Sequence, residues 1–403
     1  MLQRIQWRRF LAVITVFVAM GGFVGWLTTR DPVVVHRMSL TKDAGLAGHL
    51  VFLPNGGVAA ADLRQVHSVD AQGNVNWRLD LWGSLGMGGQ YPDLEQLADG
   101  SLVTAWASAT NGRHLVWITN GVVRRTLACD LAQAPMGGRF AVVVSNDVCV
   151  ALKEAVALFG PDGSERWRFE SQAPVVSAPV RTPEGDWLFE APSPATNVMF
   201  RLRADGTLRW RRETEPGYGM GPAVRSDGSF VWGRGPGLTL AAFDADGNPL
   251  WQLGRPEVAT CMPAMAAGDV AIVGAWEIDK PVRLLSVDRA GKVLWETPLS
   301  QGNLSHSPVV APDGTIYVVT MDRWVRAFDA QGHLKWRYRV SWRMDRYLPR
   351  GLGELVGWWK QRMGYARPVG TGPPQLDAQG RLWIAFSHDG ALFRFGPGNG
   401  EGP

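Results

Sequence analysis

Short apolar runs alternate with polar turns along the whole chain, and one such pattern recurs at a fixed spacing. An apolar pair is followed by a polar turn that contains Gly, and Trp stands four residues after that Gly. The Trp residues of this motif are Trp77, Trp167, Trp210, Trp251, Trp295 and Trp336. The last four intervals between them are 43, 41, 44 and 41 residues. A constant period of this length predicts a repeat architecture.

Each unit also has a first half, in which two apolar runs flank a tight turn. Asn-Gly and Asp-Gly between β-rich runs predict hairpins, because Gly and Asn tolerate a positive φ. Eight such turns centre on Asn55-Gly56, Asp99-Gly100, Asn146-Asp147, Glu184-Gly185, Asp227-Gly228, Gly268-Asp269, Asp313-Gly314 and Gln379-Gly380. Four short strands in a unit of about 40–45 residues are typical of a propeller blade. We therefore predict an all-β fold, an eight-bladed β-propeller.

Two units depart from the repeat. The interval of 90 residues before Trp167 hides a degenerate unit near residue 120, where the turn at Asn120-Gly121 is present and the Trp is missing. The eighth unit stops at residues 392–395, before any Trp motif. An open ring would expose unpaired strand edges. We expect residues 33–38 to supply the missing outer strand.

The N-terminal region has the pattern of a membrane anchor. Residues 10–27 form an uncharged, mostly apolar run, close to the ~20 residues that span a bilayer as a helix. Arg4, Arg8 and Arg9 precede it, so the positive-inside rule predicts a cytoplasmic N-terminus. We expect residues 1–30 to be a tail and transmembrane signal-anchor in the inner (cytoplasmic) membrane, with the propeller, 31–403, in the periplasm or its equivalent. A cleaved signal peptide is the alternative.

Charge and cysteine content narrow the choice of partners. The chain has 41 Lys and Arg against 37 Asp and Glu, and four of the Arg lie in residues 1–30. The remainder is balanced, which argues against nucleic acid as a partner. The three cysteines, Cys129, Cys149 and Cys261, form no metal-binding spacing. Either they are three buried thiols, or Cys129 and Cys149 form a disulfide.

One insertion interrupts the repeat before the last unit, at residues 341–369. Its apolar residues follow helical spacing, and its basic residues exceed its acidic ones by four. A short, basic amphipathic helix with Trp suits a membrane surface or a partner's groove. The alternative is a helix that folds back over the ring. The candidate interaction residues are Trp342, Arg346, Arg350, Trp358, Trp359, Lys360 and Arg362.

The repeat resembles that of the quinoprotein (PQQ-type) propellers. The pattern apolar-x-Ala/Ser-x-Asp-x-x-Gly-x-x-x-Trp is clearest in residues 242–251, 286–295 and 327–336. It is most similar to non-catalytic members such as the BamB-like envelope assembly factors. The resemblance covers roughly residues 45–396 and implies that the motif Trp packs between neighbouring blades. WD40 propellers fit less well, because no Gly-His and Trp-Asp pair occurs. BamB-like proteins are typically lipoproteins, whereas the first cysteine here is Cys129.

No recognisable catalytic motif accompanies the fold. PQQ dehydrogenases of the resembling family commonly carry adjacent cysteines, a calcium site and a catalytic Asp. This chain has no adjacent cysteines, and Glu277, Asp279 and Asp322 are scattered singly. A hydrolase elbow, a phosphate loop and a His-Glu-x-x-His motif are missing as well. We therefore expect no catalytic residues, no metal site and no cofactor, with PQQ plus calcium as the alternative.

Two classes of function stay open at this stage. The favoured one is a membrane-anchored extracytoplasmic scaffold that binds a protein partner, in envelope assembly or secretion. The alternative is a ligand-binding ring, either a PQQ-dependent oxidoreductase with a divergent site or a propeller that binds a small ligand or sugar. Trp106, Trp187, Trp232, Trp276 and Trp383 bear on the second class, since they either line a central pocket or fill the core of the blades.

Overall fold

The computed structural model describes the repeat region and leaves several connections aside. The described residues are 35–39, 50–61, 64–81, 93–108, 112–131, 141–175, 178–192, 196–214, 221–233, 240–254, 258–259, 261–277, 280–299, 304, 306–321, 324–339, 372–386 and 391–396. The predicted transmembrane segment 10–27 and the predicted insertion 341–369 lie outside them. Among the described residues, no helix has the length and apolar character needed to cross a membrane.

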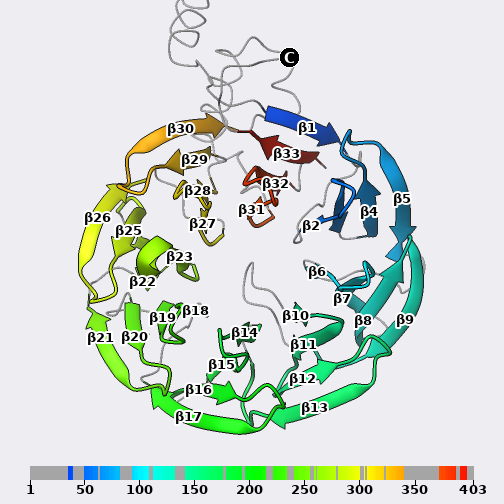
Figure 1. Cartoon of the computed structure of the whole chain (residues 1–403), viewed down its shortest axis with the longest axis horizontal. Helices are drawn as coiled ribbons and strands as arrows, with labels where there is room; N and C mark the ends of the chain where they lie inside the picture. The colour runs from blue at the N-terminus through cyan, green and yellow to red at the C-terminus, as the bar shows by residue number, and fades with distance from the viewer. Residues whose placement is uncertain are drawn as a thin grey trace, which may run out of the picture.

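The described strands form eight antiparallel sheets arranged as the blades of a ring (Figure 1). Blade 1 contains β2 (Val51–Phe52), β3 (Val58–Ala61), β4 (Gln65–Val69) and β5 (Val75–Asp80). Blade 2 contains β6 (Asp93–Gln96), β7 (Leu102–Ser108), β8 (Gly112–Thr119) and β9 (Val122–Ala128). Blade 3 contains β10 (Ala141–Val144), β11 (Asp147–Ala151), β12 (Ala155–Phe159) and β13 (Glu165–Glu170). Blade 4 contains β14 (Val180–Arg181), β15 (Trp187–Pro192), β16 (Asn197–Leu202) and β17 (Leu208–Thr214).

The second half of the ring follows the same order. Blade 5 contains β18 (Pro222–Val224), β19 (Phe230–Gly233), β20 (Leu240–Phe243) and β21 (Pro249–Leu253). Blade 6 contains β22 (Val258–Ala259), β23 (Ala264–Ala266), the 3₁₀ turn η1 (Ala267–Asp269), β24 (Val270–Trp276), β25 (Arg283–Val287) and β26 (Val293–Pro298). Blade 7 contains β27 (Val309–Val310), β28 (Ile316–Val319), β29 (Trp324–Phe328) and β30 (Leu334–Arg339). Blade 8 contains β31 (Gln375–Leu376), β32 (Leu382–Phe386), β33 (Ala391–Phe395) and β1 (Val35–Ser39).

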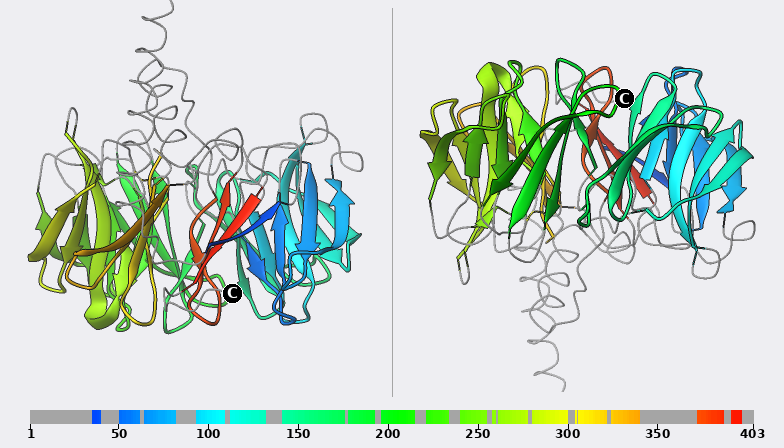
Figure 2. Two further views of the ribbon diagram at one scale, coloured as in Figure 1. Left: turned by 90° about the horizontal axis from the view of Figure 1, so that it is seen from above. Right: turned by 90° about the horizontal axis from the view of Figure 1, so that it is seen from below.

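The prediction of eight blades is confirmed, and so is the closing strand. β1 pairs with β33 in an antiparallel register from Val35↔Phe395 to Ser39↔Ala391. The two strands lie side by side in both orientations of the ring (Figures 1 and 2). Residues near the two ends of the described chain therefore complete the same blade, and the ring closes by backbone hydrogen bonds.

Apolar cores between blades hold the ring together. The described buried residues form eight clusters, and each cluster joins two consecutive blades, including blade 8 with blade 1. Trp106, Trp187, Trp232 and Trp383 are almost completely buried in these clusters, and Trp276 is half-buried against one. The interpretation that these five Trp residues belong to the core, and do not line a central pocket, is therefore confirmed, because they pack between the blades.

Both tight turns of a blade lie on one face of the ring, which we call the turn face. The inner turn joins the first two strands of a blade and the outer turn joins the last two, so antiparallel order places them at the same end. The outer turn of blade 2 confirms the degenerate unit, with positive φ at Asn120 and Gly121. We call the contact between consecutive blades a junction and name it by the two blade numbers.

Inner turns differ in length in a regular way. Five residues separate the paired strands in most blades, as in blade 2, where Gln96 pairs with Leu102. Blade 3 has two residues, between Val144 and Asp147, and blade 6 has three. Both shortened turns accept a hydrogen bond from the preceding blade, since Ala98 N donates to Ser145 O over 2.9 Å and Ser226 N donates to an Asp269 carboxylate oxygen over 3.1 Å.

Candidate interaction sites at the blade junctions

Four of the six motif Trp residues link consecutive blades by hydrogen bonds. The indole Nε1 of Trp167 donates to Ala204 O in blade 4 over 3.2 Å, and that of Trp295 donates to Ala330 O in blade 7 over 2.9 Å. Trp210 and Trp251 make the same bond to Ala245 O and Arg289 O. Each acceptor lies in the outer turn of the next blade. Trp210 is buried, and the other five motif Trp residues are half-buried.

The Trp contact explains the Gly of the motif. Gly206 has φ of 84°, which favours glycine, and a Cβ there would lie 2.5 Å from the ring of Trp167. A Cβ at Gly332 would lie equally close to Trp295, at 2.5 Å. The repeat therefore pairs a large ring in one blade with a missing side chain in the next.

At junctions 2/3 and 7/8 other residues replace the Trp–Gly contact. In blade 2, Arg125 stands at the motif position opposite Trp117, and its Cδ lies against Gly163 of blade 3. At junction 7/8, Trp336 stacks on Phe395 with ring centroids 5.7 Å apart and planes 19° apart. Phe395 belongs to β33. Trp336 therefore packs on an aromatic residue of this strand, at the place where the other motif Trp residues pack on the outer turn of the next blade.

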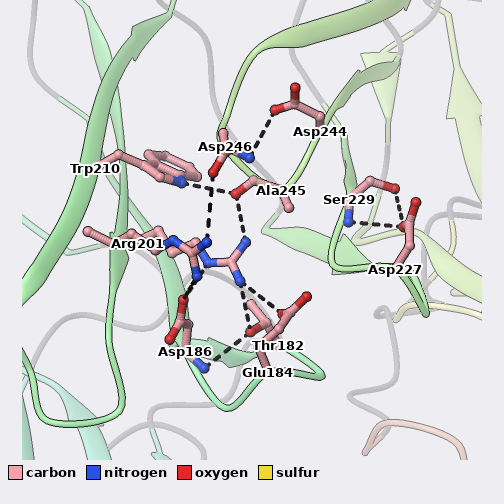
Figure 3. Close-up of polar contacts among 11 residues, drawn as sticks. Thr182, Glu184, Asp186, Arg201, Trp210, Asp227, Ser229, Asp244, Ala245 and Asp246 are labelled. Atoms are coloured by element: carbon pink, nitrogen blue, oxygen red, sulfur yellow. Dashed lines mark hydrogen bonds and ion pairs between the residues drawn. The ribbon is translucent and has the colours of Figure 1, made fainter.

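A buried guanidinium group lies at the centre of junction 4/5 (Figure 3). Arg201, 1% exposed, extends from β16 next to Trp210. Its Nε donates to Asp186 over 2.8 Å and its Nη2 donates to Glu184 over 2.9 Å. Its Nη1 donates to Ala245 O in blade 5 over 2.6 Å, the same carbonyl that Trp210 uses. A planar cation with two carboxylates and a carbonyl is a satisfied buried ion group.

The carboxylates of this network also reach across the junction. Asp186 accepts a second bond from Arg209, 2.9 Å away, and Arg209 extends to Asp246 of blade 5 over 3.8 Å. A Cβ at Gly228 of blade 5 would lie 2.4 Å from a Glu184 oxygen, so Glu184 packs directly on that turn. Hydrogen bonds from its own backbone, together with Arg201, lower the pKa of Glu184. The network fixes blade 4 to both turns of blade 5.

Junction 5/6 contains a second buried guanidinium group with different surroundings. Arg225 is 1% exposed, and its inner-turn position in blade 5 is the one that Thr182 holds in blade 4. Its Cζ lies 5.7 Å from the ring centroid of Trp251. None of its three side-chain nitrogens has a hydrogen-bond partner among the described residues. Burial, followed by the nearby Arg289, lowers the pKa of Arg225.

The carboxylates near Arg225 bind another cation. Arg289, in the outer turn of blade 6, forms ion pairs with Asp227 of blade 5 and with Asp269 of blade 6, the latter over 3.4 Å. Asp269 also accepts bonds from Ser226 N and Ser226 Oγ at 3.1 and 3.0 Å. A surface ion network therefore covers the buried cation on the turn face.

One shallow hollow opens on the turn face beside the short inner turn of blade 3. Its volume is about 390 Å³, and it is lined by Pro54, Gln96, Leu97, Ala98, Gly100, Val143 and Ser145. These residues come from the inner turns and innermost strands of blades 1, 2 and 3. The two-residue turn of blade 3 leaves this space next to the five-residue turn of blade 2. The lining carries no charged side chain, in contrast to junction 5/6.

The sequence-based chemistry candidates do not converge in the described part of the chain. No three or more His, Cys, Asp or Glu side chains gather there as metal ligands would. Glu277 binds Lys280 over 2.8 Å, and Asp279 and Asp322 lie outside the described residues. PQQ with calcium therefore stays an alternative hypothesis, to which the described acids add no ligand cluster.

The cysteines and the insertion complete the comparison with the sequence. Cys129, Cys149 and Cys261 are free thiols, so the disulfide alternative is wrong. Burial raises the pKa of Cys129 to about 11 and that of Cys149 well above its ordinary value. The candidate residues of the insertion, Trp342, Arg346, Arg350, Trp358, Trp359, Lys360 and Arg362, lie outside the described residues, and their role stays a prediction. Arg125, Arg201 and Arg225 were missed by the sequence analysis.

The closed ring of eight antiparallel sheets, several of them linked by indole hydrogen bonds, is an eight-bladed β-propeller. A family model described as outer membrane protein assembly factor BamB matches residues 64–275 and 236–351, well over half of the chain. The chain belongs to this family of PQQ-like β-propellers. No curated protein matches the sequence significantly.

Solved structures agree with the fold. BamB from Moraxella catarrhalis has a TM-score of 0.63 and 17% identity, over 90% of this chain and 99% of that chain. Selenomethionine-substituted virginiamycin B lyase from Staphylococcus aureus has a TM-score of 0.52 and 11% identity, over 90% and 99%. The C-terminal WD40 domain of Sif2 has a TM-score of 0.62 and 15% identity, over 89% and 97%. At these identities the likeness shows the fold alone, and it includes a lyase.

Proposed function

We propose that this chain is a membrane-anchored, extracytoplasmic scaffold that binds protein partners during envelope assembly. The observation that carries this proposal is membership of a family whose model is named for outer membrane protein assembly. The described charged groups at the junctions support it, since they bind one another across blades and stabilise the ring. A rigid ring of this kind presents its turns and loops to other proteins.

The anchor and the location belong to the same proposal. The arginines before the apolar run 10–27 favour a cytoplasmic N-terminus, with the ring outside the inner membrane. We expect the full chain to stay in the membrane fraction after carbonate extraction and residues 31–403 to be soluble. Release of the full chain by carbonate, with a shortened N-terminus in its mass spectrum, would favour a cleaved signal peptide.

Site-specific photo-cross-linking in intact cells tests the partner. A benzoylphenylalanine at Ser145 samples the turn face, one at Lys360 samples the insertion, and one at Gln252, on the outer strand of blade 5, is the control. We expect one envelope protein to be captured from Lys360 or Ser145 and not from Gln252. Equal capture of many proteins at all three positions would contradict a specific scaffold.

Deletion of residues 341–369 separates the two readings of the insertion. If the insertion contacts the partner, the shortened chain keeps its thermal unfolding transition and loses the cross-linked product. If the insertion is a structural cover, the same deletion lowers the unfolding temperature.

Calorimetric titration of residues 31–403 with PQQ and calcium tests the alternative function. Micromolar binding at one site would favour an oxidoreductase over the scaffold.

A further inference from the structure

Junction 5/6 holds two arginines and two carboxylates in an uneven arrangement. Arg289 binds both Asp227 and Asp269, whereas Arg225 lies buried beside them without a hydrogen bond from its guanidinium group. A buried charge without a hydrogen-bonding partner destabilises a fold, because the group has lost its hydration without compensation. Arg225 would therefore be stabilised by hydrogen bonds to the same two carboxylates that now bind Arg289.

The two carboxylates keep their positions without Arg289. Asp227 accepts hydrogen bonds from Ser229 N at 3.1 Å and from Ser229 Oγ at 2.6 Å. Asp269 accepts two bonds from Ser226 of blade 5. The third acid nearby, Asp288, binds the backbone of its own turn at Ala290 and Lys292. Removal of Arg289 would thus leave two ordered anions next to Arg225.

Exposure decides which arginine meets a partner. The side chain of Arg289 is 57% exposed on the turn face, whereas Arg225 is 1% exposed beneath it. An approaching molecule therefore reaches Arg289 first. Its guanidinium group presents a planar fork that suits a carboxylate in a bidentate pair.

We propose that Arg225 is a reserve counter-ion for Asp227 and Asp269, and that it frees Arg289 to bind a carboxylate of an acidic segment on a partner protein. This inference rests on the scaffold function proposed above. In the exchange, Arg289 leaves the two aspartates, Arg225 turns to them, and Arg289 pairs with the incoming carboxylate. The two aspartates keep a cationic partner, Arg289 gains one in the incoming carboxylate, and the buried guanidinium group gains the hydrogen bonds that it lacks. Arg289 is therefore the energetic centre of a docking site at junction 5/6.

The first experiment needs no partner. A crystal structure of Arg289→Ala is expected to show the Arg225 guanidinium within hydrogen-bond distance of Asp227 or Asp269. Denaturant unfolding of Arg289→Ala, Arg225→Met and the double variant completes a cycle. We expect Arg225→Met to leave the folding equilibrium unchanged or raise it in the native background, where it removes an unpartnered buried charge, and to lower it about tenfold in the Arg289→Ala background. An unmoved Arg225 together with additive effects would overturn the proposal.

The second experiment measures docking with a defined probe, a ten-residue peptide of alternating Glu and Ser. We expect saturable binding to the full chain in a calorimetric titration, weakened about tenfold by Arg289→Ala, in the range of a charged hydrogen-bond pair. Arg203→Ala, an exposed arginine of blade 4, is the matched control and should bind as the native chain does. A peptide with Gln in place of Glu should not bind.

These outcomes separate the exchange from the scaffold function. Equal peptide affinity for the native chain and Arg289→Ala would overturn the docking site, whatever the cellular cross-links show. Exchange and peptide binding with no partner captured in cells would count against the scaffold function, since the site itself would be intact.

Discussion

Junctions 4/5 and 5/6 each bury one arginine next to a motif Trp, but only one of the two arginines is satisfied. Arg201 makes hydrogen bonds to Asp186, Glu184 and a carbonyl of the next blade. Arg225 stacks near Trp251 and makes no side-chain hydrogen bond within the described residues. The two junctions share the indole bond, but the inner turn that blade 6 brings to junction 5/6 is shorter than the one that blade 5 brings to junction 4/5.

Two positions account for the contrast. Asp186 ends the inner turn of blade 4, and the same position in blade 5 is Ser229. Ser229 donates its hydroxyl to Asp227 and offers no carboxylate to a guanidinium group. The arginine itself enters from the third strand in blade 4 and from the inner turn in blade 5. The space under the outer turn is thus filled by an arginine at both junctions, but the arginine comes from a different position of the repeat in each.

The largest expected effect comes from breaking the satisfied junction. Asp186→Ala removes a carboxylate shared by Arg201 and Arg209 and leaves a buried cation short of its partner. We expect a loss of about 3–5 kcal/mol in the free energy of unfolding, measured by urea denaturation. Asp246→Ala, which removes an exposed carboxylate with a 3.8 Å contact, is the control and should cost less than about 1 kcal/mol. Equal losses would show that burial does not decide the outcome.

The next effect compares the two indoles. Trp210 is 8% exposed, whereas Trp251 is half-buried. We expect Trp210→Ala to lower the free energy of unfolding by about 3 kcal/mol and Trp251→Ala by less, in proportion to the apolar area removed. Urea unfolding of both variants gives the comparison. A larger loss at Trp251 would mean that its contact with the Arg225 guanidinium group contributes more than burial does.

A repair should make the two junctions alike. Ser229→Asp places a carboxylate beside Arg225 at the position that Asp186 holds in blade 4. We expect a gain below about 1 kcal/mol in the free energy of unfolding, because the charged hydrogen bond to the buried guanidinium group is partly offset by the lost Ser229 hydroxyl bond to Asp227 and by repulsion between the two carboxylates. The same substitution in an Arg225→Met background should give no gain. An equal gain in stability in both backgrounds would mean that it does not come from a bond to Arg225.

The smallest effect appears in acid. Hydrogen bonds from the Ser229 hydroxyl, and then those from its amide and the charge of Arg289, hold the pKa of Asp227 below its ordinary value of 3.8. A carboxyl group with a lowered folded-state pKa stabilises the protein above the unfolded pKa, and this contribution disappears as the pH falls through the folded value. We expect the stability of Asp227→Asn to depend less on pH below about 4 than that of the native chain. Parallel curves down to pH 2 would contradict this.

Periodicity made the fold predictable, because a Gly-to-Trp spacing that recurs every 41 to 44 residues leaves one architecture. The closing strand was predictable too, since an eighth unit without an outer strand needs one from elsewhere. The buried arginines were not. Arg201 is the charged residue of an otherwise largely apolar strand, β16, and Arg225 stands in a polar inner turn, and an arginine at either place is ordinarily expected to reach solvent. Their burial depends on the outer turn of the next blade, about 40 residues away, as with Arg201 Nη1 and Ala245 O.

The inner turns also contain a sequence signal that predicts contacts between blades. The inner turns of blades 1, 4 and 7 carry Pro54, Pro183 and Pro312, which have no N–H to donate. Blades 2 and 5 carry Ala98 and Ser226 at that position, and their N–H groups bind the shortened turns of blades 3 and 6. A comparison of turn lengths and proline positions along the repeat would have predicted these contacts. No similar pattern marks Arg225.

The pairing of β1 with β33 has a consequence for biosynthesis. The outer strand of blade 8 leaves the ribosome first and its partner leaves last, so seven blades are synthesised before the ring can close. Throughout that time β1 presents an unpaired edge, which is a template for wrong pairing. Loss of residues 391–395 would accordingly affect the first strand of the chain as well as the last. A fault in residues 391–395 therefore exposes the edge of a strand made more than 350 residues earlier.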